Sequence, residues 1–227
     1  MTTFVLVHGA WHGSWCWKRV RKALQAAGHE VFTPTLTGVG ERSHLLARDV
    51  DLRTHQLDVM NLLRWEELDD VVLCGHSYAG FVVSGVADAM PERLRALVYL
   101  DAFVPEHGEC LANLAPVSGD ELVDGWKSPP IPAAAFNVNT ADQAWVDRQC
   151  TLQSLACFQQ PLQLTGGLAR VPRVRYLFAS GWAEGNPIFR PQYERAKARG
   201  WDTAEIDCGH DVMLDAPEAL TRYLLAS

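Results

Sequence analysis

A serine between small residues is the first feature of this sequence that could carry out chemistry. Ser77 lies in the stretch DDVVLCGHSYAG (69–80), where a short apolar run ends at Gly75. This order predicts a strand, a sharp turn and a helix, and such a turn exposes a strained serine at the edge of a sheet. The usual pattern G-x-S-x-G has Ala79 at its last position here, followed by Gly80. The alternative is an ordinary turn in which the serine only caps the helix.

A histidine near the end of the chain could supply the base that such a serine needs. A serine hydroxyl is a poor nucleophile unless a base lies within hydrogen-bonding reach. His210 directly follows the last expected strand. Because sites in open parallel sheets form at the carboxyl ends of the strands, His210 is expected near Ser77. The two residues together predict acyl transfer through a serine nucleophile.

Two acidic residues could orient this histidine. Asp101 ends the strand that is expected after the serine helix, whereas Glu184 lies in the loop after the following sheet strand, where the acid is customarily found. We favour Asp101, because its position needs no rearrangement of a loop, and Glu184 is the alternative. Asp207 and Asp211 lie too close to His210 in the sequence to be comfortable partners.

Backbone amides are expected to stabilise the negative charge that develops on the substrate. The amide of Tyr78 lies at the start of the serine helix. A second donor is expected from the loop HGAWHG (8–13), with the amide of Ala10 favoured. His12 in this loop is expected to make a hydrogen bond that braces it.

Apolar runs and helical spacing place these residues in one α/β domain that spans residues 1–227. About six parallel strands alternate with helices, and Asp215 is the expected N-cap of the last helix. The expected strands are 4–7, 29–33, 71–74, 95–100, 174–179 and 203–206, and the expected helices are 15–27, 52–67, 81–90, 191–199 and 215–225.

A long segment, 105–172, interrupts this pattern and shows no clear strand. Its length and its many prolines predict a lid of short helices and loops inserted within the domain. Aromatic residues in the lid could line an apolar pocket or could only pack the lid onto the sheet. Trp11 and Trp126 are the candidates for contact with a substrate.

Composition excludes several classes of partner. The net charge is -7, with no cluster of lysine or arginine, so nucleic acid is not expected. No run is long enough to span a membrane, and no export signal is visible, which predicts a cytoplasmic protein with reduced cysteines. The histidines and cysteines lack the spacing of a metal site, so no metal is expected.

Four motifs together resemble the α/β-hydrolase superfamily, and within it the plant methylesterase and hydroxynitrile lyase group. They are FVLVHGAWHGSWCW, GHSYAG, YLDAFVP and GHDVML. The resemblance implies a serine hydrolase with a helical cap that acts on small, rather apolar esters without a cofactor. Ser77 and His210 match the nucleophile and base of the group, and Ala10 and Tyr78 match its oxyanion donors.

The chain departs from this group at two places. The group carries its acid after the strand that corresponds to 174–179, where this chain has Ser-Gly-Trp (180–182), which favours a relocated acid at Asp101. The lyases have a lysine after the histidine and a threonine in the first loop, where this chain has Asp211 and Gly9. Cleavage of cyanohydrins is therefore not expected, because an acidic Asp211 would repel cyanide.

These features predict a serine carboxylesterase whose partner is a small-molecule ester. A ligand-binding protein of the same fold with slow turnover is an alternative, as is a hydrolase of lactones, amides or thioesters. A homodimer is compatible with the sequence, which does not determine the oligomeric state.

Overall fold

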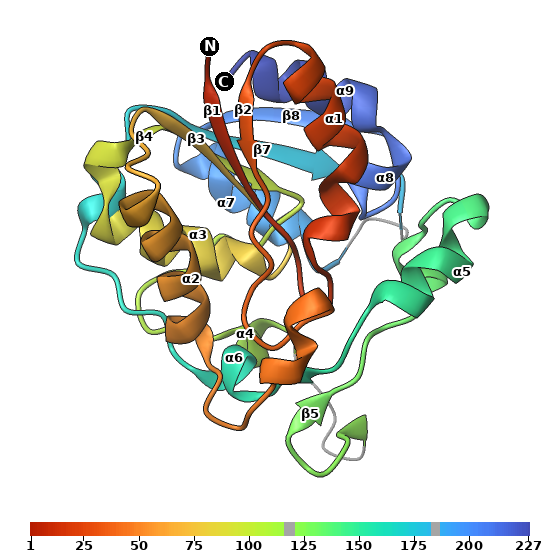
Figure 1. The fold of residues 1–227 in the computed structure, drawn as a ribbon. Helices are drawn as coiled ribbons and strands as arrows, with labels where there is room; N and C mark the ends of the chain where they lie inside the picture. The colour runs from red at the N-terminus through yellow and green to blue at the C-terminus, as the bar shows by residue number, and fades with distance from the viewer. Residues whose placement is uncertain (116–120, 183–186) are drawn as a thin grey trace.

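The core of the protein is a sheet of six parallel strands (Figure 1). The computed structural model describes residues 1–115, 121–182 and 187–227. The strand order is β2-β1-β3-β4-β7-β8, so the strand before Ser77 lies near the middle of the sheet. The strands are β1 (Thr3–Val7), β2 (Glu30–Phe32), β3 (Val71–His76), β4 (Leu94–Leu100), β7 (Val174–Ala179) and β8 (Asp202–Ile206).

Helices cover both faces of this sheet (Figure 1). Crossovers between parallel strands are right-handed as a rule, so the reversal of strand order after β2 moves the later crossover helices to the opposite face from α1. One face carries α1 (Lys18–Ala26), α8 (Val212–Asp215) and α9 (Pro217–Leu225), and the other carries α2 (Leu52–Trp65), α3 (Ala79–Ala89) and α7 (Arg190–Ala198).

The structure confirms the six parallel strands and corrects two helix boundaries. The first helix begins at Lys18, because Ser14–Trp17 forms a separate 3-10 turn, η1. The prediction that Asp215 caps the last helix is wrong. Asp215 ends α8, and its carboxylate accepts hydrogen bonds from the backbone N–H and side chain of Asn139.

The segment between β4 and β7 contains short helices and one small antiparallel sheet of two strands. The expectation of no strand here is wrong, since β5 (Lys127–Ser128) and β6 (Gln153–Ser154) pair antiparallel. Strands of two residues are too short to show a period in sequence. The helical pieces are α4 (Leu111–Leu114), η5 (Ala133–Phe136), α5 (Thr140–Gln149), α6 (Ala156–Gln159) and η6 (Gly167–Arg170).

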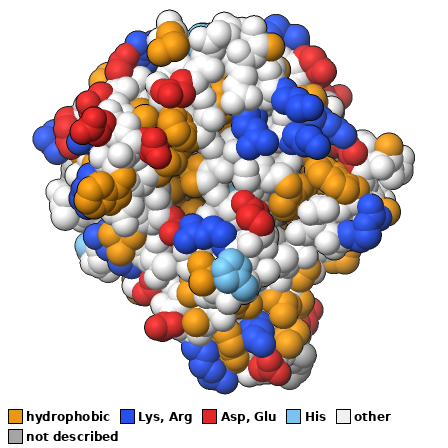
Figure 2. Space-filling model, in the orientation of Figure 1, with side chains coloured by type: hydrophobic (Ala, Val, Ile, Leu, Met, Phe, Trp, Pro, Cys, Tyr) orange, Lys and Arg blue, Asp and Glu red, His pale blue; other side chains and the backbone are white. Residues whose placement is uncertain are grey.

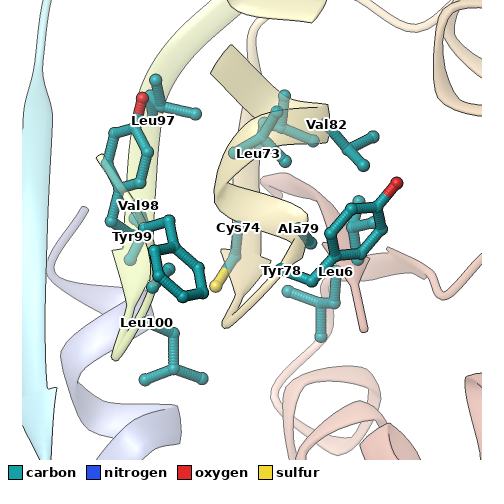
Figure 3. Close-up of a cluster of buried hydrophobic side chains, with 14 of the residues drawn as sticks. Leu6, Leu73, Cys74, Tyr78, Ala79, Val82, Leu97, Val98, Tyr99 and Leu100 are labelled. Atoms are coloured by element: carbon teal, nitrogen blue, oxygen red, sulfur yellow. The ribbon is translucent and has the colours of Figure 1, made fainter. Parts of the chain in front are cut away.

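Apolar side chains from the central strands pack in one cluster with Tyr78 and Ala79, the residues that follow Ser77 (Figure 3). Leu6 of β1, Leu73 of β3 and Leu97 of β4 are fully buried, and Val82 of α3 packs in the same cluster. Burial of a leucine or valine side chain stabilises the fold by about 1.5–3 kcal/mol. This packing gives the turn a rigid base.

Gly80 is required where α3 passes the chain after β4. A Cβ at this position would lie 1.9 Å from the carbonyl oxygen of Phe103. Ala79 is fully buried and fits without glycine. The glycine at the end of the serine motif is thus needed one residue later than in the usual pattern.

We expect Gly80→Ala to destabilise the protein, because the backbone of Phe103 must move to admit a methyl group. Overpacking of this kind costs about 1–3 kcal/mol, and urea unfolding would measure the loss. Gly28→Ala is a useful contrast, since Gly28 has a positive φ of 84° but no atom within 4 Å of an added Cβ. An unfolding free energy for Gly80→Ala equal to that of the parent would contradict the close contact.

The surface carries acidic and basic side chains in mixture on the face drawn in Figure 2, with apolar groups between them. No helix among the described residues is long and apolar enough to cross a membrane. The six cysteines are free thiols, and four of them are buried.

Candidate active site

Ser77 stands at the turn between β3 and α3 in a left-handed conformation, with φ of 56°. Such a φ is uncommon outside glycine and stores backbone strain. Hydrogen bonds hold the turn in place. The N–H of Ser77 donates to the carbonyl oxygen of Leu100 at 3.3 Å, and the carbonyl oxygen of Ser77 accepts from Gly80 and Phe103. The serine side chain lines a large cavity.

His210 faces the same cavity and is held by aromatic rings. Its backbone N–H donates to the carbonyl oxygen of Phe136 at 3.0 Å. Phe189 stacks on the imidazole with ring centroids 4.8 Å apart, and Trp182 and Phe136 contact it at 4.9 and 5.1 Å. The whole residue is only 2% exposed, so packing fixes the orientation of its ring.

Asp101 accepts a hydrogen bond from this histidine. Nδ1 of His210 lies 2.7 Å from Oδ2 of Asp101, which is completely buried at the end of β4. The same oxygen accepts from the indole Nε1–H of Trp182 at 3.0 Å, and Oδ1 accepts from the backbone N–H of Ala179 at 3.2 Å. Three donors thus satisfy the carboxylate, which offsets the cost of burying its charge.

Trp182 is a site residue that sequence reasoning missed. In the sequence, Trp182 is only the third residue after the strand 174–179, where the resembling group has its acid. In the structure this tryptophan points its N–H at Asp101. The donor therefore comes from the loop after β7, and the carboxylate from the residue directly after β4. The alternative acid, Glu184, lies outside the described residues.

His76 ties the serine turn to the loop that carries His210. Its Nε2–H donates to the carbonyl oxygen of His210 at 3.0 Å, and the two rings lie 4.4 Å apart. Burial lowers the pKa of His76 well below its usual value, and the neighbouring His210 lowers it further. His76 is therefore neutral and acts as a fixed donor beside Ser77.

The hydroxyl of Ser77 makes no hydrogen bond within the described part of the chain, although Ser77 and His210 line one cavity. Because Nδ1 of His210 is engaged by Asp101, Nε2 is the nitrogen available to a partner in the cavity. Hydrogen bonds between a nucleophile and its base are often long without substrate and tighten in the complex.

Ala10 and Tyr78, whose backbone amides are the expected oxyanion donors, also line the cavity. Neither N–H donates to a protein acceptor among the described residues. The Tyr78 side chain is buried away from solvent, and its hydroxyl lies 2.9 Å from Nδ1 of His55. This contact anchors the residue and leaves its amide at the N-terminus of α3, where a helix favours negative charge.

The cavity has a volume of about 680 Å³ and a largely apolar wall. Trp11 lines it, but Trp126 is not among the described residues that do; Arg48 and Lys127 lie over the Trp126 ring instead. No lysine or arginine lines the described wall, and the one carboxylate there belongs to Glu121. The apolar residues are Ala10, Trp11, Phe103, Leu111, Leu114, Ala115, Pro129, Pro130, Ile131, Pro132, Phe136, Phe158, Ile188 and Phe189.

Asp211 follows His210 but does not line this cavity. Its side chain is fully buried and bonds to His12 instead. The sequence predicts that the Asp211 carboxylate faces the site and would repel a cyanide ion there. This placement is wrong, because the carboxylate lies outside the cavity wall. Among the described residues, no group of three or more histidine, cysteine or acidic side chains is placed to hold a metal ion.

Comparison with known proteins agrees with this geometry. Residues 4–222 match the model of the alpha/beta hydrolase family. A carbendazim hydrolyzing esterase from Nocardioides sp. is 45% identical over 243 positions, which cover 100% of this chain and 99% of the relative. Methylesterase 7 from Arabidopsis thaliana is 37% identical over 105 residues, which cover 45% of this chain and 40% of that protein.

Solved structures show the same fold at lower identity. An extracellular alpha/beta-hydrolase from a Paenibacillus species superposes with a TM-score of 0.85 at 23% identity, covering 100% of this chain and 98% of that one. Polyneuridine aldehyde esterase gives a TM-score of 0.78 at 21% identity, covering 100% and 98%. Together the family match and the relatives support an ester hydrolase. The chain belongs to the alpha/beta hydrolase family.

Proposed function

We propose that the protein is a serine carboxylesterase. Ser77 is the nucleophile, His210 its general base, and Asp101 the acid that orients His210. The observation that carries this proposal is the buried 2.7 Å hydrogen bond between Asp101 and His210 beside a cavity that holds Ser77 at a strained turn. A histidine held in this way keeps its proton on Nδ1 and presents Nε2 to the serine.

The reaction would proceed through an acyl-enzyme. Oγ of Ser77 forms a bond to the ester carbonyl carbon while its proton passes to Nε2 of His210, and the amides of Ala10 and Tyr78 receive the oxyanion. The C–O bond to the alcohol then breaks, and His210 gives the proton to the departing oxygen. Water repeats these steps on the acyl-enzyme and releases the acid.

The substrate we infer is a neutral ester with a bulky apolar part. Aromatic and aliphatic side chains form most of the cavity wall, and no described lysine or arginine there could bind a substrate carboxylate. The relative named for carbendazim hydrolysis supports the inclusion of that compound among the candidates. We further propose that the protein acts in the cytoplasm without a metal or organic cofactor.

A fluorophosphonate probe tests the proposal directly. We expect stoichiometric labelling of Ser77, located by peptide mapping, with parallel loss of hydrolysis of methyl esters, aryl esters or carbendazim. Labelling at another residue, or hydrolysis that survives complete labelling of Ser77, would contradict the mechanism. Slow labelling together with tight binding of an unhydrolysed ester would favour the slow-turnover ligand-binding protein.

A further inference from the structure

A buried histidine connects two of the loops that carry the site. His12 follows Ala10 by two residues, and the ring is almost completely buried behind the cavity wall. Its Nδ1 lies 2.7 Å from the carbonyl oxygen of Ala10, and its Nε2 lies 3.1 Å from Oδ2 of Asp211, the residue after His210. The histidine and the aspartate are 199 positions apart in the sequence.

Both oxygen atoms that contact this imidazole are acceptors, and the third contact, Sγ of Cys150, lies farther away, 3.9 Å from Nδ1. A backbone carbonyl oxygen cannot donate, and an ionised carboxylate cannot donate either. Two hydrogen bonds to such partners require a proton on each ring nitrogen, which is the imidazolium form. A neutral imidazole has only one N–H and would leave a lone pair facing an acceptor.

The surroundings favour this charged form. Burial alone lowers the pKa of His12, but Asp211 and, less strongly, Cys150 outweigh it and raise the pKa well above 6.5. Burial would raise the pKa of Asp211, and His12 and then His76 overcome this and lower it. The remaining neighbours are the Trp15 ring, which stacks on the imidazole at 5.0 Å, and two histidines. The ring of His76 lies edge-on at 6.4 Å, and burial keeps its pKa well below the usual value. Burial lowers the pKa of His8 to about 3.

We propose that His12 is a positioning residue whose imidazolium locks the loop of the Ala10 amide to the loop of His210. This inference rests on the proposed role of that amide as an oxyanion donor. His12 does not line the cavity, so it acts through Ala10 and Asp211. Together with His76, which bonds the carbonyl oxygen of His210, it fixes three loops relative to one another.

The lock depends on pH in a defined direction. Because the pKa of His12 is raised by folding, its contribution to stability is complete below about pH 6.5 and is lost as the pH rises through the raised value. The pKa of Asp211 is lowered, so its contribution is complete above about pH 3.9 and is lost only at far more acid pH. The pair is therefore intact from weakly acid to neutral pH.

The variant Asp211→Asn removes the negative charge beside His12 but still allows both hydrogen bonds of the imidazole. The amide group of asparagine can donate to Nε2 of a neutral His12, which still donates from Nδ1 to Ala10. With ¹⁵N-labelled histidine, NMR at pH 7 should show both His12 nitrogens protonated in the parent and only Nδ1 protonated in Asp211→Asn. A neutral His12 in the parent at this pH would overturn the proposal.

His12→Gln tests positioning. Glutamine can replace Nε2 as a donor to Asp211 but does not place a donor at Nδ1. We expect kcat per fluorophosphonate-labelled site to fall about tenfold, less than the loss of a whole oxyanion donor, with KM within about threefold. The affinity for a trifluoromethyl ketone, which forms an oxyanion on Ser77, should fall in parallel with kcat.

Normalisation to labelled sites removes the effect of misfolded protein. If His12→Gln folds poorly, Asp211→Leu cuts the same link from its other end and is expected to give the same split between kcat and KM. If whichever of these variants folds keeps the parent kcat per labelled site, the positioning role of His12 is wrong, while the proposed function is unaffected. Failure of the parent to label at Ser77 would instead refute the proposed function.

Discussion

Ser77→Ala is expected to abolish ester hydrolysis. The variant lacks the oxygen that forms the acyl-enzyme, and loss of the nucleophile in a serine protease costs about 10⁶-fold in kcat. We expect a fall of at least about 10⁴-fold, since an esterase substrate is easier to hydrolyse by water alone. The measurement is turnover of an aryl ester, with fluorophosphonate labelling as the second readout.

Ser128→Ala provides a matched control. Ser128 lines the same cavity, is 1% exposed, and its hydroxyl has no hydrogen-bond partner among the described residues. Removal of this hydroxyl should leave the fluorophosphonate labelling of Ser77 stoichiometric. Hydrolysis by Ser77→Ala at the parent rate would exclude an acyl-enzyme on Ser77. Loss of labelling in Ser128→Ala would indicate that Ser128, and not Ser77, is the nucleophile.

The sheet and its crossovers could be predicted because their signals are local. The strands β1, β3, β4 and β7 consist mostly of apolar side chains, and the predicted bounds of β7 are the observed ones, Val174–Ala179. The turn at Ser77 follows from the glycine and serine pattern, which needs no long-range information. By contrast, β5 and β6 have two residues each and leave no pattern to detect.

The surroundings of the histidine could not be predicted, because they depend on contacts across the sheet. Trp182 donates a hydrogen bond to Asp101, which is 81 residues away in the sequence, and His12 contacts Asp211, which is 199 residues away. In sequence, Asp211 reads only as an acid next to His210. The fold turns its side chain away from the cavity, where it meets a histidine and not a substrate.

The most informative test of the acid is Asp101→Asn, which we expect to lower kcat about 10⁴-fold, as the same change does in a serine protease. In the parent, all three groups that face the carboxylate are donors: His210, Trp182 and Ala179. Asparagine retains one acceptor oxygen and brings an NH₂ group into this ring of donors. If that NH₂ faces His210, the proton moves to Nε2, and the histidine can no longer accept the proton of Ser77.

Two further variants separate the acid from its surroundings. Trp182→Phe removes one donor to Oδ2 but leaves the bond to His210, so it should cost far less than Asp101→Asn, about tenfold in kcat. Glu184→Gln alters the alternative acid and should leave kcat within about twofold of the parent, because the proposed mechanism gives Glu184 no role. A larger loss of kcat in Glu184→Gln than in Asp101→Asn would show that Glu184, and not Asp101, is the acid of the triad. The ordering that we expect follows from the structure, because the buried carboxylate of Asp101 already holds the Nδ1 proton of His210.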